Sequence, residues 1–166
     1  MPVFTIETEL ETLRGAFNEQ EVSGENVALD TRTTAAFVAR VPGKVLKLMP
    51  PQIYFVFQAD AATPLMLGAI RTATSTYACR VAGKIIDDTL VVPVVIAKRI
   101  EDEAGLIKIL NKRSEVSNFY QIPVVLVPDE KKWYWRTTAD VIGFLGFPNF
   151  RKAISTRLGG EKYEKY

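Results

Sequence analysis

The sequence contains no histidine and a single cysteine, Cys79. Without histidine the chain has no imidazole base, no imidazole metal ligand and no Ser-His-Asp triad. One cysteine excludes an internal disulfide and a cysteine-rich zinc site. Cys79 falls in a predicted helix, where a buried structural thiol is more common than a nucleophile. Enzymatic activity stays open, but these absences favour a non-enzymatic protein with no cofactor and no metal.

Long apolar runs are also missing. No run approaches the ~20 apolar residues that a membrane-spanning helix needs. The first residues, MPVFTIETELE, are acidic, whereas a secretory signal begins with basic residues. We therefore expect a cytoplasmic protein without a membrane partner. The 166 residues, 48% hydrophobic and 24% charged, are typical of a globular domain that needs no disulfide or metal to fold.

Positive charge is unevenly distributed. The net charge is +2, yet residues 131–160 hold six lysines and arginines against Asp140 alone, a net charge of +5. Residues 1–30 carry a net charge of −6. The basic segment is either an electrostatic footprint for an anionic partner or a solvated face without consequence. The acidic N-terminal helix is either a plain surface helix or one that docks on the basic C-terminal segment.

The N-terminal third predicts a helix over residues 5–18, because its apolar residues recur at helical spacing. Thr8 and Glu11 form a capping box if the helix starts late. The apolar positions are Ile6, Leu10, Leu13 and Phe17.

The sequence Val-Pro-Gly-Lys at 41–44 is typical of a type II turn. It predicts a hairpin-like pair of strands over 37–41 and 44–48, and a helix over 33–40 stays open as an alternative. Pro50 and Pro51 predict a boundary between an N-terminal appendage, residues 1–51, and an α/β core, residues 52–160.

The core pattern is clearer. It predicts strands over 53–57, 90–97 and 121–127, separated by helices over 64–82 and 101–113. Uninterrupted Val/Ile/Leu runs are typical of a sheet covered on both faces, and repeated strand–helix–strand units imply parallel strands. The prolines within two of these strands, Pro93 and Pro123, predict a strand start, an edge or a bulge. The bond before Pro123 is left open as cis or trans.

The C-terminal segment predicts a strand over 133–135 with Trp133 and Trp135 on one face and Tyr134 on the other. A helix over 137–145 and a last helix over 150–158, capped by Asn149, follow. Residues 161–166 read as a flexible tail. The predicted fold class is α/β: a mixed, mainly parallel sheet with flanking helices in the order βαβαββα, preceded by an α+β appendage.

Two resemblances follow from these motifs. The order βαβαββα, with Ile122-Pro123 before the third strand, resembles the thioredoxin fold. The segment FQADAATPL, residues 57–65, is similar to the one that carries the thioredoxin cysteines, but Ala62 and Leu65 occupy their places. This resemblance implies a non-redox thioredoxin-like or Rossmann-like scaffold that acts through protein–protein contacts or self-association.

The C-terminal segment VVLVPDEKKWYWRTTADVIGFLGFPNFRKAI resembles the Bro N-terminal domain of phage antirepressors and large DNA viruses. The resemblance implies a DNA-binding protein of viral or mobile-element origin. The spacing from Trp133 to Asp140 is longer here than in that family. The matching positions are Trp133-Tyr134, Asp140-Val141, Leu145-Gly146-Phe147, Asn149 and Arg151-Lys152-Ala153-Ile154.

The primary functional hypothesis is therefore a non-enzymatic nucleic-acid-associated protein that uses a basic C-terminal helix pair. Amide, hydroxyl and cationic side chains on one helix can donate to phosphates and base edges. The tryptophans and Phe150 are interpreted as core residues rather than a stacking platform for bases. The candidate nucleic-acid-binding residues are Arg136, Asn149, Arg151, Lys152 and Ser155.

A metal-dependent enzyme ranks last among the hypotheses. Asp87-Asp88 and Glu101-Asp102-Glu103 offer the carboxylate oxygens that Mg²⁺ prefers. A loop and the first turn of a helix explain these acids equally well. Nucleic acid and a second copy of the chain are the partners that these hypotheses imply.

Overall fold

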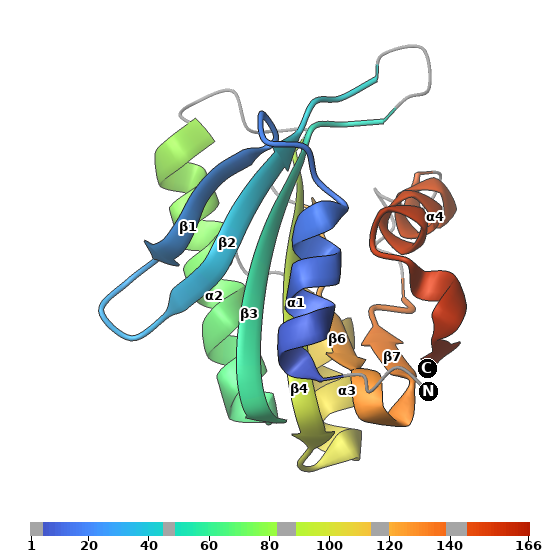
Figure 1. Cartoon of the computed structure of the whole chain (residues 1–166). Helices are drawn as coiled ribbons and strands as arrows, with labels where there is room; N and C mark the ends of the chain where they lie inside the picture. The colour runs from blue at the N-terminus through green and yellow to red at the C-terminus, as the bar shows by residue number, and fades with distance from the viewer. Residues whose placement is uncertain (1–4, 45–48, 83–88, 114–119, 139–145) are drawn as a thin grey trace.

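The structure is a computed structural model that describes residues 5–44, 49–82, 89–113, 120–138 and 146–166. A mixed sheet of eight strands runs through it, with helices on both faces (Figure 1). The prediction of a mixed α/β chain is confirmed. The strands are β1 (Val22–Ala28), β2 (Thr34–Val41), β3 (Gln52–Ala62), β4 (Leu90–Ile100), β5 (Tyr120–Gln121), β6 (Val124–Val127), β7 (Lys132–Trp135) and β8 (Glu164–Lys165). The helices are α1 (Ile6–Gly15), α2 (Pro64–Ala82), α3 (Glu103–Asn111) and α4 (Phe147–Arg157), with short 3-10 turns at Pro128–Glu130 and Gly160–Lys162.

The strands lie in the order β1-β2-β3-β4-β6-β7-β8, and β5 also pairs with β4. β1, β2 and β3 are antiparallel, while β3, β4 and β6 are parallel neighbours connected by α2 and α3. β6 and β7 form an antiparallel hairpin, and β8 runs parallel to β7. Sequence neighbours therefore remain neighbours in space from one edge of the sheet to the other.

Strand β4 explains why the sheet has two hydrophobic cores. Its residues alternate between the two faces: Val92, Val94 and Ile96 join the core under α1 and α4, and Val91 and Val95 join the core under α2 and α3. Each of these five side chains is fully buried. Because both faces are covered, the strand needs an unbroken apolar run rather than an alternating one.

Pro123 lies where the sheet ladder is interrupted, whereas Pro93 lies inside a central strand. The segment predicted as one strand is divided into β5 and β6, and Pro123 lies in the gap between them. Pro93 lies inside the central strand β4, immediately before Val94, which pairs with Val124. The Ile122–Pro123 peptide bond is trans. Pro123 is tolerated because the ladder is broken at that point. The prediction of a strand start, an edge or a bulge is wrong for Pro93, which pairs with Phe55 in an unbroken register and faces a gap only on the β6 side.

Three N-terminal predictions need correction. Helix α1 is capped by Thr5, whose hydroxyl accepts from the Thr8 backbone N–H, so the capping box is Thr5/Thr8 and not Thr8/Glu11. The alternative helix over 33–40 is wrong, because those residues form β2. β2 pairs with β1 and β3, and the predicted partner strand over 44–48 lies mostly outside the described residues. The predicted boundary at Pro50-Pro51 falls between two strands of one sheet.

The C-terminal segment also differs from its prediction. α4 begins at Phe147, after the N-cap residue Gly146, so Asn149 lies in the first turn and does not cap the helix. The predicted tail returns to the sheet, where Glu164–Lys165 form β8. The backbone N–H of Glu164 donates to the Lys131 carbonyl and that of Tyr166 to the Trp133 carbonyl, both at 2.8 Å. The helix predicted over 137–145 lies mostly outside the described residues.

Candidate nucleic-acid interface

Helix α4 packs on the sheet against the two tryptophans of β7. Trp133 is fully buried and Trp135 nearly so, and their rings meet edge to face at a centroid distance of 5.3 Å. Phe147 and Ile154 of α4 belong to the same core cluster. The interpretation of both tryptophans as core residues is confirmed, and neither ring is available as a platform for bases. Tyr134 faces the opposite core, as predicted.

Arg136 does not lie on the surface with the other candidates. Only 1% of the residue is exposed, and its guanidinium donates to the backbone carbonyls of Thr138 at 2.9 Å and Gln121 at 3.2 Å. The guanidinium also lies over the Tyr120 ring. The expectation that Arg136 presents a charge to solvent is therefore wrong, because its guanidinium is buried and joins the backbone at Gln121 to the backbone at Thr138.

Arg151 is half-buried. Its guanidinium carbon lies 3.9 Å from the centre of the Trp135 ring, and its Nε is covered by protein. Burial lowers the pKa of Arg151 below its ordinary value, because the charged form loses water contacts. A stacked guanidinium of this kind is attracted to the negative face of the indole. Part of this cation is therefore committed to the tryptophan and not to solvent.

The remaining candidates lie on the outer side of α4. Asn149 and Lys152 are exposed, and Ser155 is half-buried. The helix carries Arg151, Lys152 and Arg157 but no acidic residue. Its N-terminal turn contains a proline and has no side-chain cap. Backbone N–H groups at the start of a helix carry partial positive charge and attract anions, so this end of α4 adds to the positive field of its cations.

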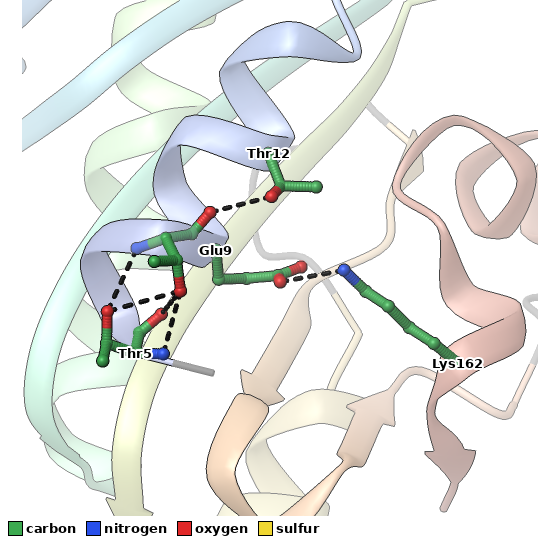
Figure 2. A network of polar contacts seen from close by, with 5 residues as sticks. Thr5, Glu9, Thr12 and Lys162 are labelled. Atoms are coloured by element: carbon green, nitrogen blue, oxygen red, sulfur yellow. Dashed lines mark hydrogen bonds and ion pairs between the residues drawn. The ribbon is translucent and has the colours of Figure 1, made fainter. Parts of the chain in front are cut away.

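The acidic N-terminal helix lies against the C-terminal part of the chain, but its own ion pair is with the tail, just beyond the basic segment 131–160. Glu9 of α1, 1% exposed, accepts from Lys162 Nζ at 2.8 Å (Figure 2). Arg157 at the end of α4 pairs with Glu21 at 3.2 Å and donates to the Ala16 carbonyl at 3.1 Å. The two ends of the chain are thus joined over one face of the sheet (Figure 1).

A buried polar network between α2 and β5 is absent from the sequence-based predictions. Arg71 Nε donates to Gln121 Oε1 at 2.6 Å, and its Nη1 donates to the Ile109 carbonyl. The Gln121 amide nitrogen donates in turn to the hydroxyls of Thr74 and Ser75 and to the Arg71 carbonyl. Every polar atom of the Gln121 side chain is therefore used, which marks the network as structural rather than as a ligand site.

The acidic candidates for a metal site have structural roles where the structure describes them. Asp102, in the left-handed conformation, caps α3 by accepting from the Gly105 N–H at 3.0 Å. Glu103 accepts from the Tyr134 hydroxyl, and burial together with this carboxylate raises the pKa of Tyr134. Within the described part of the chain, no three His, Cys, Asp or Glu side chains gather as metal ligands. Asp87-Asp88 lies outside the described residues.

Comparison with known proteins adds no relative. No protein-family model, no curated protein and no solved structure matches this chain. Among the helices that the structure describes, none has the length and apolar character to cross a membrane. The functional argument therefore rests on the chain's own residues.

Proposed function

We propose that the protein is a non-enzymatic, nucleic-acid-associated protein that contacts the phosphate backbone through α4. The observation that carries the proposal is the charge of this helix: three cations, no acid and an uncapped N-terminal turn. Its exposed polar side chains suited to phosphate oxygens are Asn149, Lys152 and Thr156. The Bro-like motif over the same residues supports this interpretation, and a viral or mobile-element origin rests on that resemblance alone.

The geometry favours weak binding that depends on salt. Lys152 is the one cation of α4 with an exposed side chain, because Arg151 stacks on Trp135 and Arg157 is held by Glu21. Affinity for nucleic acid grows with the number of phosphates neutralised. With Lys152, part of Arg151 and the helix N-terminus as contacts, about two or three phosphates are neutralised. Sequence preference is expected to be low, because these groups contact the backbone rather than base edges.

Binding of a fluorescently labelled 20-nucleotide DNA, single-stranded and duplex, tests this function across a salt series. We expect a slope of log K against log salt of about −2 to −3, from ~0.9 counterions released per phosphate on duplex DNA. Lys152→Ala should make this slope less negative by about 1. Lys108→Ala is the matched control, because Lys108 is an exposed helical lysine of α3 on the opposite face of the sheet. No binding at low salt, or equal effects of both variants, contradicts the proposal.

A second candidate function is a scaffold that associates with a second copy of the chain through α2. Leu65 in the first turn of this helix is 87% exposed, the most exposed of the large apolar residues that the structure describes. The exposed positions that follow, Ala69, Thr72 and Thr76, are small and uncharged, and the first exposed charge on α2 is Arg80. An uncharged face meets its own copy in a symmetric dimer without repulsion between like charges.

Replacement of Leu65 by lysine tests the second function. If α2 is a dimer interface, the new lysine places an unpaired charge in an apolar contact, and the dimer fraction should fall at least 10-fold. The folded monomer should remain intact, because the Leu65 side chain is already in water. Sedimentation equilibrium over a range of concentrations measures the change, with Thr76→Lys as a second variant further along the same face. A wild-type protein that is monomeric at all concentrations rules this function out.

A further inference from the structure

Residues 159–166 leave α4 and run along the edge of the sheet beside β7 (Figure 1). We call these residues the strap. The strap begins at Gly159, whose φ of +67° lies in the left-handed region that favours glycine. Two backbone hydrogen bonds hold its strand β8 to β7, and the N–H groups of Glu164 and Tyr166 donate them at 2.8 Å. Among the described strands, only β8 pairs with this side of β7.

The side chains of the strap cover Trp133, which is fully buried. The Tyr163 ring, itself 7% exposed, lies 5.9 Å from the Trp133 ring, and Lys165 Nζ lies 5.7 Å from the centre of the same ring. Beyond them, Tyr166 stacks on Tyr134 at a centroid distance of 5.0 Å. Release of the strap would therefore bring the Trp133 ring and the backbone groups of β7 into contact with water.

One carboxylate of α1, that of Glu9, holds the strap from the neighbouring helix. The residue is 1% exposed, and its Oε2 lies 2.8 Å from Lys162 Nζ (Figure 2). Burial, together with the charge of Glu9 and its hydrogen bond with the Tyr163 hydroxyl, raises the pKa of Tyr163. Both of these partners belong to the strap. Hydrogen bonds to a charged group are about twice as strong as those between neutral groups, so the charge of Glu9 stabilises the closed strap.

We infer that the strap is a cover for the edge of β7 that opens as a unit while the sheet stays folded, and that the charge of Glu9 keeps it closed. Two backbone hydrogen bonds, one carboxylate and a few aromatic contacts oppose its opening, whereas the central strands are buried on both faces. Segments with few buried contacts open locally at a lower free energy than global unfolding requires. The uncovered edge is a row of unpaired backbone groups, which an extended segment recognises. In the closed state its occupant is the chain's own β8.

Hydrogen exchange of the full chain, followed by NMR at each amide, measures the opening. The Glu164 and Tyr166 amides report on the strap, and the amides of β4 report on global unfolding. We expect the strap amides to exchange at least ~100-fold faster than those of β4. Their rates should respond weakly to low concentrations of urea, because a local opening exposes little surface. Equal rates with an equal dependence on urea would mean that the strap opens only on global unfolding, which would overturn the inference.

Glu9→Gln removes the charge and preserves the shape of the side chain. We expect exchange at the two strap amides to become about 10-fold faster, because the hydrogen bonds from the strap lose their charged acceptor. Glu11→Gln is the matched control, since Glu11 is an exposed acid of the same helix, and it should leave these rates unchanged. Unchanged strap rates in Glu9→Gln, or the same acceleration in Glu11→Gln, would contradict the role of the Glu9 charge.

A second variant removes the same ion pair from the side of the strap. Lys162→Met deletes the cation without a change in α1 and should also accelerate exchange at the strap amides, so unchanged rates would count against the inference. If Glu9→Gln does not fold, this variant and the wild-type comparison of strap and β4 still decide. Opening of the strap does not involve the outer side of α4, so its failure leaves the proposed nucleic-acid contact untouched.

Discussion

Replacing Arg71 by methionine is expected to lower the free energy of unfolding by about 3 kcal/mol. Hydrogen bonds to a buried charged group contribute ~1.5–3 kcal/mol, and burying the acceptors left without a donor adds a further cost. Arg71 is 7% exposed and donates to Gln121 Oε1 and the Ile109 carbonyl. Methionine fills much of the same volume but donates nothing. Gln121, 1% exposed, would then hold a buried acceptor without its donor. The loss therefore propagates from α2 to the central strands.

Thermal and urea unfolding followed by circular dichroism measure this effect. For a chain of this size, 3 kcal/mol corresponds to a fall in Tm of about 6–12 °C. Arg80→Met is the matched control on the same helix: Arg80 is exposed and donates to the Leu29 carbonyl, so about 1 kcal/mol or less is expected. Equal losses in the two variants would contradict a structural role for the network.

Arg71 also shows why the sequence reveals less of the site than of the fold. An arginine in a predicted helix reads as a surface charge, and so does Arg136 in a basic segment. Both are buried because tertiary packing brings backbone carbonyls to them, from Ile109 and from Gln121 and Thr138. Those carbonyls come from other elements, so no local pattern identifies them. Arg136 therefore does not belong to the candidate nucleic-acid interface, although its place in the basic segment predicts it there.

Glu9 is a residue that the sequence could have identified. It lies three residues after Ile6 and four before Leu13, on the apolar stripe of α1, and all three side chains are buried. A carboxylate within a buried stripe requires a cation from another element. The acidic N-terminus and basic C-terminus of the chain supply such a pair, which is the ion pair with Lys162.

Buried elements have a strong pattern of apolar residues in the sequence and could be predicted. Exposed edge elements have no such pattern and could not. The apolar run of β4 and the proline that opens α2 specify their elements locally. The edge strand β1 has the sequence VSGENVA, mostly exposed, with a bulge near Gly24 and Asn26 at a φ of +49°. It lacks alternating apolar residues because it forms only by pairing with β2. The clearest remaining consequence of burial concerns the tyrosines.

The free energy of unfolding is expected to fall steeply above pH 10, because three tyrosines are buried in the folded protein. Tyr54, Tyr134 and Tyr163 are at most 7% exposed, and burial raises the pKa of each above its ordinary value of about 10. Each phenol stays protonated in the folded state and ionises in the unfolded state as the pH passes 10. The stability that they contribute is thus fully present below pH 10 and is lost as the pH rises further.

The predicted slope is steep. Each such tyrosine lowers the free energy of unfolding by about 1.4 kcal/mol per pH unit above 10, so the three together approach about 4 kcal/mol per unit. Urea unfolding at a series of pH values from 8 to 11.5 measures this slope.

Tyr54→Phe removes one of the three phenols and should reduce the tyrosine-dependent slope by about a third. This variant also loses the bond from the Tyr54 hydroxyl to Gln52, so it starts less stable at pH 8 and its slope, rather than its absolute stability, is the diagnostic quantity. An identical slope in wild type and Tyr54→Phe would mean that Tyr54 ionises freely in the folded protein, which is incompatible with a fully buried ring between α1 and the sheet.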